Sequence, residues 1–301
     1  MIVFIVGLRR SGTTVFWRNF RQDERFTCFD EPFNPLHREI PRPHFKNTRT
    51  ELIRQYRKNP SQFKSLFNPI KPLQELSDEF TPAQRTYIQF LLHNASHQHY
   101  VVDLTRCHFK IGALHSLFPG SYLIHLHKSP ASFASSHLLP SYKRLPRWSR
   151  GAKRFVDRFF FFSRRFNFNR WKMEDIIGRN SAGPFPRQVL EDPSFRENFG
   201  RAPAVSKLMS YWDILYKKVE KEGAHHFGDR FRSISLEAFC RAPEDVIQSL
   251  YQWIDLPYHP LSFNHVKFPS KPYKAGDPRW KERARLLNLE DSSSFLFRYE
   301  S

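Results

Sequence analysis

The chain has 301 residues, of which 40% are hydrophobic and 26% are charged, and this ordinary globular composition excludes a disordered or collagen-like chain. Its 48 Lys and Arg residues outnumber its 29 Asp and Glu residues and give a formal net charge of +19. So basic a chain is expected to bind an anionic partner: a nucleic acid, an acidic glycan, a membrane surface or a phosphorylated small molecule.

Predicted strands and helices alternate from the first residues onward. Runs of β-branched and aromatic residues predict strands at 2–6, 26–29, 100–104, 122–127 and 231–234. After a first helix that opens at Thr13, helical patterns fall at about 48–58, 82–97, 109–117, 130–138, 204–222 and 243–254. This order predicts an α/β fold in which helices flank a central parallel sheet. Because no linker divides the chain, residues 1–301 are expected to form a single domain.

The first predicted strand ends at a loop that suits phosphate binding. Residues 7–14, with the sequence GLRRSGTT, connect this strand to the first helix, so backbone N–H groups and a helix N-terminus face one point. The spacing matches the GxxxxGK[ST] loop of nucleoside triphosphatases, but Thr13 stands where that loop needs Lys. ATP or GTP chemistry is therefore disfavoured, and a phosphotransferase with a degenerate loop is kept as an alternative function.

A second cationic motif follows the strand predicted at 122–127. The sequence continues with Lys128, Ser129 and Pro130, and Ser136 lies eight residues after Lys128. A lysine at the end of a strand, beside the start of a helix, can pair with a phosphate as a point charge. The alternative interpretation is a helix-capping serine next to a solvated lysine.

Together, the RSGTT run of loop 7–14 and this second motif resemble the sulfotransferases that use 3′-phosphoadenosine 5′-phosphosulfate (PAPS). That family has a P-loop-like α/β fold, and its second motif carries Arg where this chain has Lys128. The resemblance implies PAPS as the sulfuryl donor and no metal. It assigns donor binding to Arg9, Arg10, Ser11, Gly12, Thr13 and Thr14 at the 5′ side, to Lys128 and Ser136 at the 3′-phosphate, and to Lys274 in a basic loop near the C-terminus.

The resemblance also indicates a catalytic base and a catalytic cation. Carbohydrate and tyrosyl-protein sulfotransferases carry a Glu after the second strand, often as Glu-Pro, and this chain has Glu31 and Pro32 there. The implied reaction is an in-line transfer to a hydroxyl, expected on a carbohydrate, with Glu31 as the base and Arg10 as the cation. Other candidate bases are Asp30, His108, His125 and His127. The competing interpretation makes Glu31 an ion-pair partner of Arg9 or Arg10.

Residues 143–172 hold eleven Lys or Arg residues and one acid, interleaved with Phe and Trp. We expect them to form part of a basic helical insertion, about 143–200, which has no counterpart in the family pattern. Such a stretch suits an anionic glycan acceptor or peripheral contact with an anionic membrane. A non-catalytic protein that binds nucleic acid or an anionic membrane is therefore the second alternative function, although no specific nucleic acid is expected as a partner.

The three cysteines, Cys28, Cys107 and Cys240, are widely spaced and form no CxxC pair, so neither a disulfide framework nor a structural zinc site is expected. The apolar run at 1–7 is too short to span a membrane, and no cleavage site follows it. A cytoplasmic location is therefore expected.

Overall fold

The computed structural model describes residues 1–35, 37, 50–75, 77–139, 151–152, 155–156, 159, 161–162, 203–267 and 277–286. The chain divides into two compact units. Unit 1 comprises Met1–His127 and Lys217–Phe268, and unit 2 comprises Lys128–Tyr216 and Pro269–Ser301. The single domain expected over 1–301 stays a prediction. No helix in the described part of the chain is long and apolar enough to cross a membrane, and the cytoplasmic location also stays a prediction.

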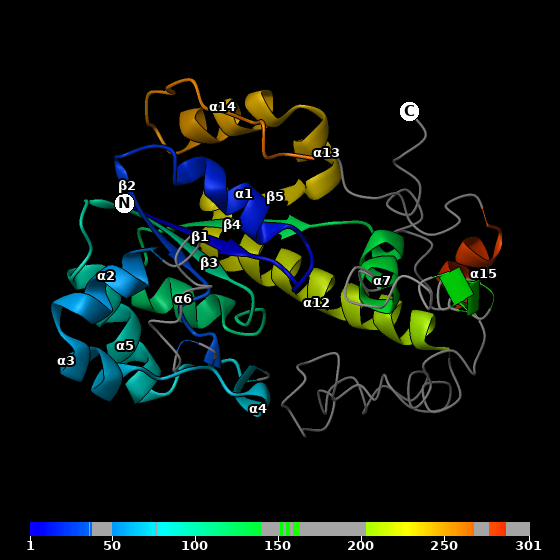
Figure 1. The fold of residues 1–301 in the computed structure, drawn as a ribbon, viewed down its shortest axis with the longest axis horizontal. Coiled ribbons are helices and arrows are strands. Elements are labelled where there is room, and N and C mark those ends of the chain that lie inside the picture. Colours follow the sequence, from blue (N-terminus) through cyan, green and yellow to red (C-terminus); the bar gives the residue numbers. More distant parts are fainter. Residues whose placement is uncertain are drawn as a thin grey trace. The chain divides into compact units, whose positions relative to one another are not determined.

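Unit 1 is built on a five-stranded sheet in which every neighbouring pair is parallel (Figure 1). In spatial order the strands are β2 (Phe26–Asp30), β3 (His99–Leu104), β1 (Ile2–Val6), β4 (Tyr122–His127) and β5 (Phe231–Ser235). Each predicted strand is confirmed to within one residue at either end. The predicted α/β fold with a central parallel sheet is therefore confirmed.

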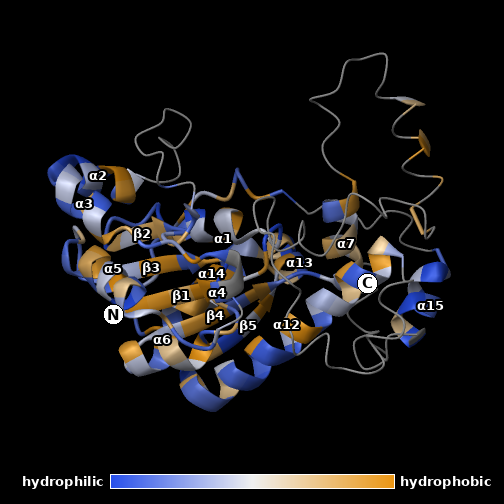
Figure 2. Ribbon diagram, turned by 90° about the horizontal axis from the view of Figure 1, so that it is seen from below, coloured by the Kyte–Doolittle hydropathy of each residue, from blue (hydrophilic) through white to orange (hydrophobic). Residues whose placement is uncertain are grey.

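Helices cover both faces of this sheet, because β1 is apolar on each side (Figure 2). Phe4 and Val6 belong to one core cluster, and the alternate residues Val3 and Ile5 belong to the other, as the period of a strand requires. Residues of five helices join the first cluster: α2 (Thr50–Lys58), α3 (Pro60–Leu66), α5 (Pro82–His93), α6 (Ile111–Leu117) and α12 (Ala204–Phe227). Residues of three join the second: α1 (Thr13–Phe20), α13 (Leu236–Arg241) and α14 (Pro243–Trp253).

The register brings the carboxyl ends of the strands to one edge of the sheet. Val6 of β1 pairs with Leu104 of β3 and with His125 of β4, and Asp30 of β2 pairs with Asp103. After β1 the chain enters α1 on one face, whereas α6, which connects β3 to β4, packs on the other. In open parallel sheets, ligands bind outside the strand ends where the connections diverge in this way. The loops after β1, β2 and β3 therefore occupy the expected binding edge.

Unit 2 contains α7 (Pro130–Leu138), the first part of α12 and α15 (Arg279–Leu286). Phe161 and Phe162 are buried against Trp280, with ring centroids 5.7 and 4.9 Å from it. Arg279 lies over the ring of Phe162 at 4.4 Å. The basic helical insertion expected at about 143–200 lies almost entirely outside the described residues.

Candidate functional site

Loop 7–14 lies tightly between β1, β4 and α1. A Cβ atom on Gly7 would approach both the carbonyl oxygen of Leu126 and the Cγ2 atom of Thr13 to 2.6 Å, so only glycine fits there. Gly12 is the N-cap of α1 and adopts a left-handed conformation with φ 86°. These two glycines allow the chain to turn from the strand into the helix within the loop.

The N-terminus of α1 presents the features of an anion site. The helix has neither a capping side chain nor an acidic residue in its first turn, so no carboxylate of that turn competes for its first N–H groups. The hydroxyl of Ser11 is buried and has no hydrogen-bond partner in the described part of the chain. Thr13 is buried and Thr14 is half-buried in the same turn. Phosphate oxygens would satisfy both the hydroxyl of Ser11 and the helix N–H groups.

The two arginines of the loop differ in their surroundings. Arg10 is exposed and has φ 70°, a left-handed conformation that is rare for a residue other than glycine. Arg9 donates from Nη2 to Oε1 of Glu75, at the end of α4 (Pro72–Glu75), over 2.8 Å, and Arg106 also forms an ion pair with Oε1. Burial raises the pKa of the Glu75 carboxyl, and Arg9 and Arg106 oppose that shift. Glu75 thus joins loop 7–14 to the loop after β3.

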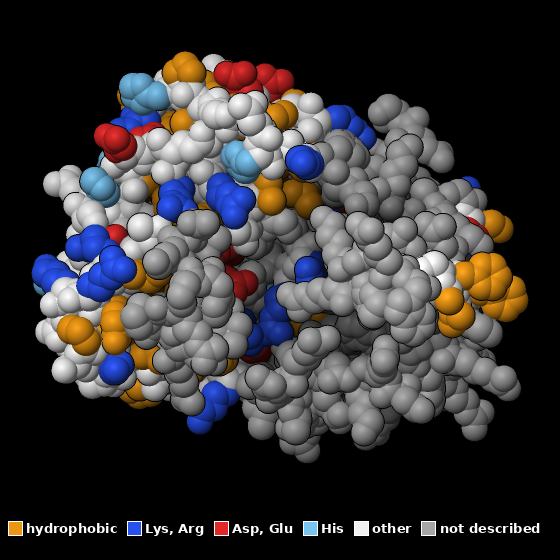
Figure 3. All heavy atoms as spheres, viewed as in Figure 1, with side chains coloured by type: hydrophobic (Ala, Val, Ile, Leu, Met, Phe, Trp, Pro, Cys, Tyr) orange, Lys and Arg blue, Asp and Glu red, His pale blue; other side chains and the backbone are white. Residues whose placement is uncertain are grey.

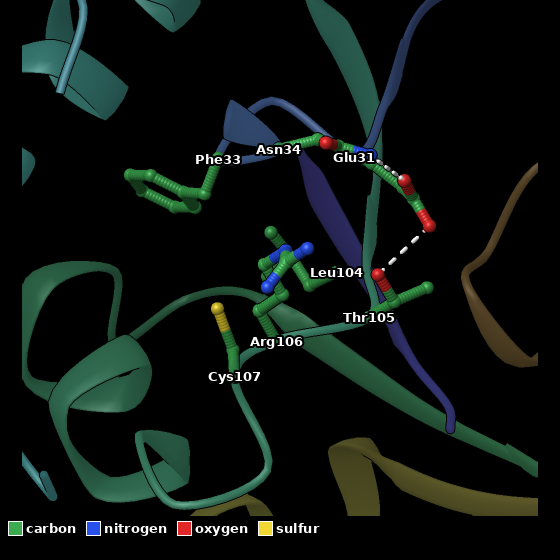
Figure 4. Close-up of a pocket in the computed structure, with 7 residues that line it drawn as sticks. All are labelled: Glu31, Phe33, Asn34, Leu104, Thr105, Arg106 and Cys107. Carbon is green, nitrogen blue, oxygen red and sulfur yellow. Dashed lines mark hydrogen bonds between the residues drawn. The ribbon is translucent and has the colours of Figure 1, made fainter. Parts of the chain in front are cut away.

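Glu31 is the first residue after β2 and adopts φ 46°. Its backbone N–H donates to the carbonyl of Asp103 over 3.0 Å, which extends the contact between β2 and β3. Its carboxylate accepts hydrogen bonds from the Thr105 hydroxyl at Oε1 (2.8 Å) and from Asn34 Nδ2 at Oε2 (2.5 Å), as Figure 4 shows. Arg9 forms an ion pair with Glu75, and the ion pair considered for Glu31 with Arg9 or Arg10 stays a prediction.

A shallow pocket of about 160 Å³, a volume that includes open solvent, adjoins Glu31 (Figure 4). Its lining residues come from the segment after β2, from the last residue of β3 and from the segment after it: Glu31, Phe33, Asn34, Leu104, Thr105, Arg106 and Cys107. The pocket therefore brings the Glu31 carboxylate next to side chains of the segment that follows β3.

The other candidate bases are held within the fold. Asp30 is buried, with 4% of its surface exposed. Burial lowers the pKa of His108 to about 3, although a hydrogen bond to the backbone of Gly7 opposes the shift. Nδ1 of His125 lies 2.5 Å from Oε1 of Glu220, which also accepts a hydrogen bond from Ser233. His108 is therefore neutral at ordinary pH, and His125 is part of a contact between β4, α12 and β5.

In unit 2, the structure brings together the two residues of the second motif. Lys128 is buried, and its Nζ donates to the hydroxyl of Ser136 over 2.8 Å. Ser129 caps α7 by accepting a hydrogen bond from the N–H of Ser132, which fixes the start of the helix that carries Ser136. Lys274 lies outside the described residues.

Three residues beside the predicted site were not found from the sequence. Thr105, Arg106 and Glu75 reach it through contacts across 74, 31 and 66 residues of chain. The available signal was the polar Thr-Arg pair directly after the apolar strand that ends at Leu104. Within the described part of the chain, no group of three His, Cys, Asp or Glu side chains could hold a metal ion.

Comparison with known proteins adds a family and a fold. The model of the sulfotransferase family matches residues 3–168. Among solved structures, the sulfotransferase domain from the curacin biosynthetic pathway is 14% identical, with a TM-score of 0.50, over 96% of this chain and 97% of that one. That likeness supports a shared fold.

Two further solved structures have lower TM-scores, and we draw nothing from them. The sulfotransferase domain of the Synechococcus PCC 7002 olefin synthase is 13% identical, over 96% of this chain and 94% of that one, with a TM-score of 0.47. The sulfotransferase from Alicyclobacillus acidocaldarius is 11% identical, over the same shares, with a TM-score of 0.42. No curated protein matches the chain.

Proposed function

The chain belongs to the sulfotransferase family, and from this premise we propose that it transfers a sulfuryl group from PAPS to a hydroxyl of a carbohydrate by in-line displacement. PAPS is the donor that the family uses. The observation that carries the proposal is loop 7–14, with its buried Ser11 hydroxyl and the uncapped N-terminus of α1.

The residues of the chain suit the donor. We assign the 5′-phosphosulfate to Arg9, Arg10, Ser11, Gly12, Thr13 and Thr14, because an anion would satisfy the Ser11 hydroxyl and the first turn of α1. We assign the 3′-phosphate to Lys128 and Ser136, which contact each other directly, and to Lys274. When bound, PAPS supplies the sulfuryl group that is transferred.

Two side chains carry the proposed acid–base and electrostatic roles. Glu31 accepts the proton of the acceptor hydroxyl, because hydrogen bonds fix its carboxylate at the edge of the sheet where loop 7–14 also lies. Arg10 provides a cation for the negative charge that develops during transfer, since it is exposed on loop 7–14. Both residues have positive φ, and strained backbone of this kind gathers at functional sites.

We take the acceptor to be a carbohydrate, and an anionic one. The Glu31-Pro32 pair resembles the carbohydrate branch of the family, and the net charge of +19 favours an acidic acceptor over a neutral one. A screen of glycans, steroids, phenols and peptides with labelled PAPS tests this choice. Preference for a phenol or a steroid would contradict it.

Calorimetry tests the donor and separates the alternative functions. We expect 3′-phosphoadenosine 5′-phosphate (PAP) to bind with a stoichiometry of one, and ATP with Mg²⁺ and a short oligonucleotide to bind much more weakly. Tight binding of ATP with Mg²⁺ would favour the degenerate phosphotransferase. Binding of the oligonucleotide alone would favour the non-catalytic alternative.

A further inference from the structure

The carboxylate of Glu31 accepts a hydrogen bond from a neutral donor at each of its oxygens. Asn34 Nδ2 lies 2.5 Å from Oε2, and the Thr105 hydroxyl lies 2.8 Å from Oε1 (Figure 4). Asn34 belongs to the turn that Glu31 itself begins, since the Asn34 N–H donates to the carbonyl of Glu31 over 2.9 Å. Thr105 instead comes from the neighbouring strand, directly after β3. The hydrogen bond from Thr105 therefore connects the Glu31 side chain to the segment that follows β3.

The backbone at Glu31 needs such a contact. Glu31 has φ 46°, in the left-handed region that residues other than glycine rarely adopt, and such a conformation persists where surrounding contacts over-determine it. The N–H of Glu31 is bonded to Asp103, and its side chain is bonded to Thr105, two residues further along the same segment. The backbone N–H and the side-chain carboxylate of Glu31 are thus both hydrogen-bonded to β3 or to the loop that follows it.

The two donors respond differently when the carboxylate takes up a proton. The Nδ2 group of Asn34 can only donate, so it favours an ionised oxygen. The Thr105 hydroxyl can donate to an ionised oxygen or rotate and accept from a protonated one. Oε1, beside Thr105, is therefore the oxygen that can gain a proton and keep its partner.

We propose that Thr105 is a positioning residue for the catalytic base: its hydroxyl aims Oε1 of Glu31 at the acceptor and remains its partner after proton transfer. In this step the acceptor O–H bond breaks, its proton bonds to Oε1, and the electron pair stays on the acceptor oxygen as the nucleophile. The proposal rests on the proposed function, in which Glu31 is the base.

Substitution of Thr105 tests the role, with labelled PAPS and a uronic acid-bearing oligosaccharide as the substrates. Thr105→Val removes the hydroxyl at nearly constant volume and is expected to lower kcat about tenfold. The KM for the acceptor and the affinity for PAP are expected to stay within about twofold of the wild type, because Thr105 is not assigned to substrate binding. Thr105→Ser keeps the hydroxyl and is expected to recover most of the lost kcat.

A matched control is available on α5. Thr86 is exposed, and its hydroxyl donates to the carbonyl of Pro82 over 3.1 Å, so Thr86→Val makes the same chemical change away from the site. We expect it to keep full kcat. If Thr105→Val does not fold, as circular dichroism and PAP binding would reveal, Thr105→Ala removes the same hydroxyl and carries the same expectation.

Measuring Glu31→Gln in the same assays separates the proposed role of Glu31 as the base from the proposed positioning role of Thr105. If Glu31→Gln loses turnover while Thr105→Val keeps it, the role of Thr105 is wrong and the proposed base stands. If Thr105→Ser loses as much kcat as Thr105→Val, the hydroxyl is not what matters, and the inference is also wrong. If Glu31→Gln keeps turnover, the proposed base and the role of Thr105 fall together.

Discussion

The carboxylate of Glu31 accepts hydrogen bonds from Asn34 and Thr105. The backbone of Glu31 adopts a left-handed conformation that glycine adopts far more easily. The only other described residues with positive φ that are not glycine are Arg10 and Asp255. Two of these three residues are the candidates for the base and the cation, which were chosen from sequence resemblance alone. The roles of Glu31 and Arg10 stay proposals, and their shared left-handed backbone is a feature often found at functional sites.

Replacement of this carboxylate is the most direct test at the residue scale. Glu31→Gln keeps the shape and the hydrogen bond from Thr105 but cannot accept a proton. We expect kcat to fall by about 100- to 10,000-fold, the usual contribution of a general base, while PAP affinity in calorimetry stays near the wild-type value. Asp30 would become the better candidate if turnover in this variant were near normal.

His108 gives a pH dependence of stability. Burial lowers its pKa to about 3 in the folded protein from the 6.5 of a free histidine, so the unfolded chain binds the proton more readily. Stability due to the neutral ring is complete above about pH 6.5 and is lost as the pH falls through the window towards 3, by at most about 1.4 kcal/mol per pH unit.

His108→Asn removes this titration and can keep a donor to the backbone of Gly7. The free energy of unfolding in urea, measured at pH 7, 5.5 and 4, is expected to fall less steeply with acidification than in the wild type. Equal slopes would mean that folding does not lower the pKa of His108.

Residue-level prediction had a clear limit. From the sequence we could propose loop 7–14, Glu31, and the pair Lys128 and Ser136 as site residues, because each lies in a short local pattern next to a predicted strand. The sequence did not reveal Thr105, Arg106 or Glu75, whose contacts join segments that are distant in sequence. Such partners depend on strand order, and the order β2-β3-β1-β4-β5 could not be read from the chain.

At the scale of elements, the turn between β1 and α1 is tightly constrained. Gly7→Ala would place a Cβ atom 2.6 Å from the Leu126 carbonyl oxygen, and a strand backbone cannot yield easily. We expect the free energy of unfolding to fall by about 2 kcal/mol or more and PAP affinity to fall with it, since loop 7–14 would shift.

Gly120 is the matched control for this substitution. An added Cβ atom there meets nothing within 4 Å, and its φ lies outside the strained range. Gly120→Ala is expected to change stability by no more than about 0.5 kcal/mol. Equal losses in both variants, measured by urea denaturation, would show that close approach at Gly7 is not the cause.

Strands were easier to predict than helices. α12 was expected at 204–222 but continues to Phe227, because Gly223 does not end it. A Cβ atom on Gly223 would lie 2.4 Å from the ring of Phe231, so this glycine serves packing against β5. The short helices α3 and α13 were missed, although Asn59 and Ser235 cap them with their side chains. Helices of six or seven residues contain too few apolar positions for a helical period to be detected in the sequence.

At the scale of the whole molecule, the excess of basic residues is the most prominent property of the chain. On the face that Figure 3 shows, the Lys and Arg side chains of the described residues lie at several separate places. The densest basic run in the sequence, residues 143–172, lies mostly outside the described residues. Its role can therefore be tested by kinetics rather than by geometry.

Neutralising four arginines of that run separates acceptor binding from donor binding. Changing Arg154, Arg158, Arg164 and Arg165 to Gln is expected to raise the KM for an acidic oligosaccharide several-fold and to leave the KM for PAPS nearly unchanged. Added salt should raise the acceptor KM of the wild type towards that of the variant, because salt screens the attraction between the arginines and the acidic acceptor. If the acceptor KM does not change, these arginines form only a solvated surface.

The two residues after β3 have a consequence for how this protein can change over evolutionary time. The Thr105 hydroxyl donates a hydrogen bond to Glu31, and its neighbour Arg106 forms an ion pair with Glu75, which also pairs with Arg9 of loop 7–14. Inserting or deleting one residue between Leu104 and Cys107 would break both contacts at once, whereas a substitution can break only one. On the proposed roles of these residues, descendants of this chain are expected to exchange side chains around the pocket more readily than to alter the length of this short segment.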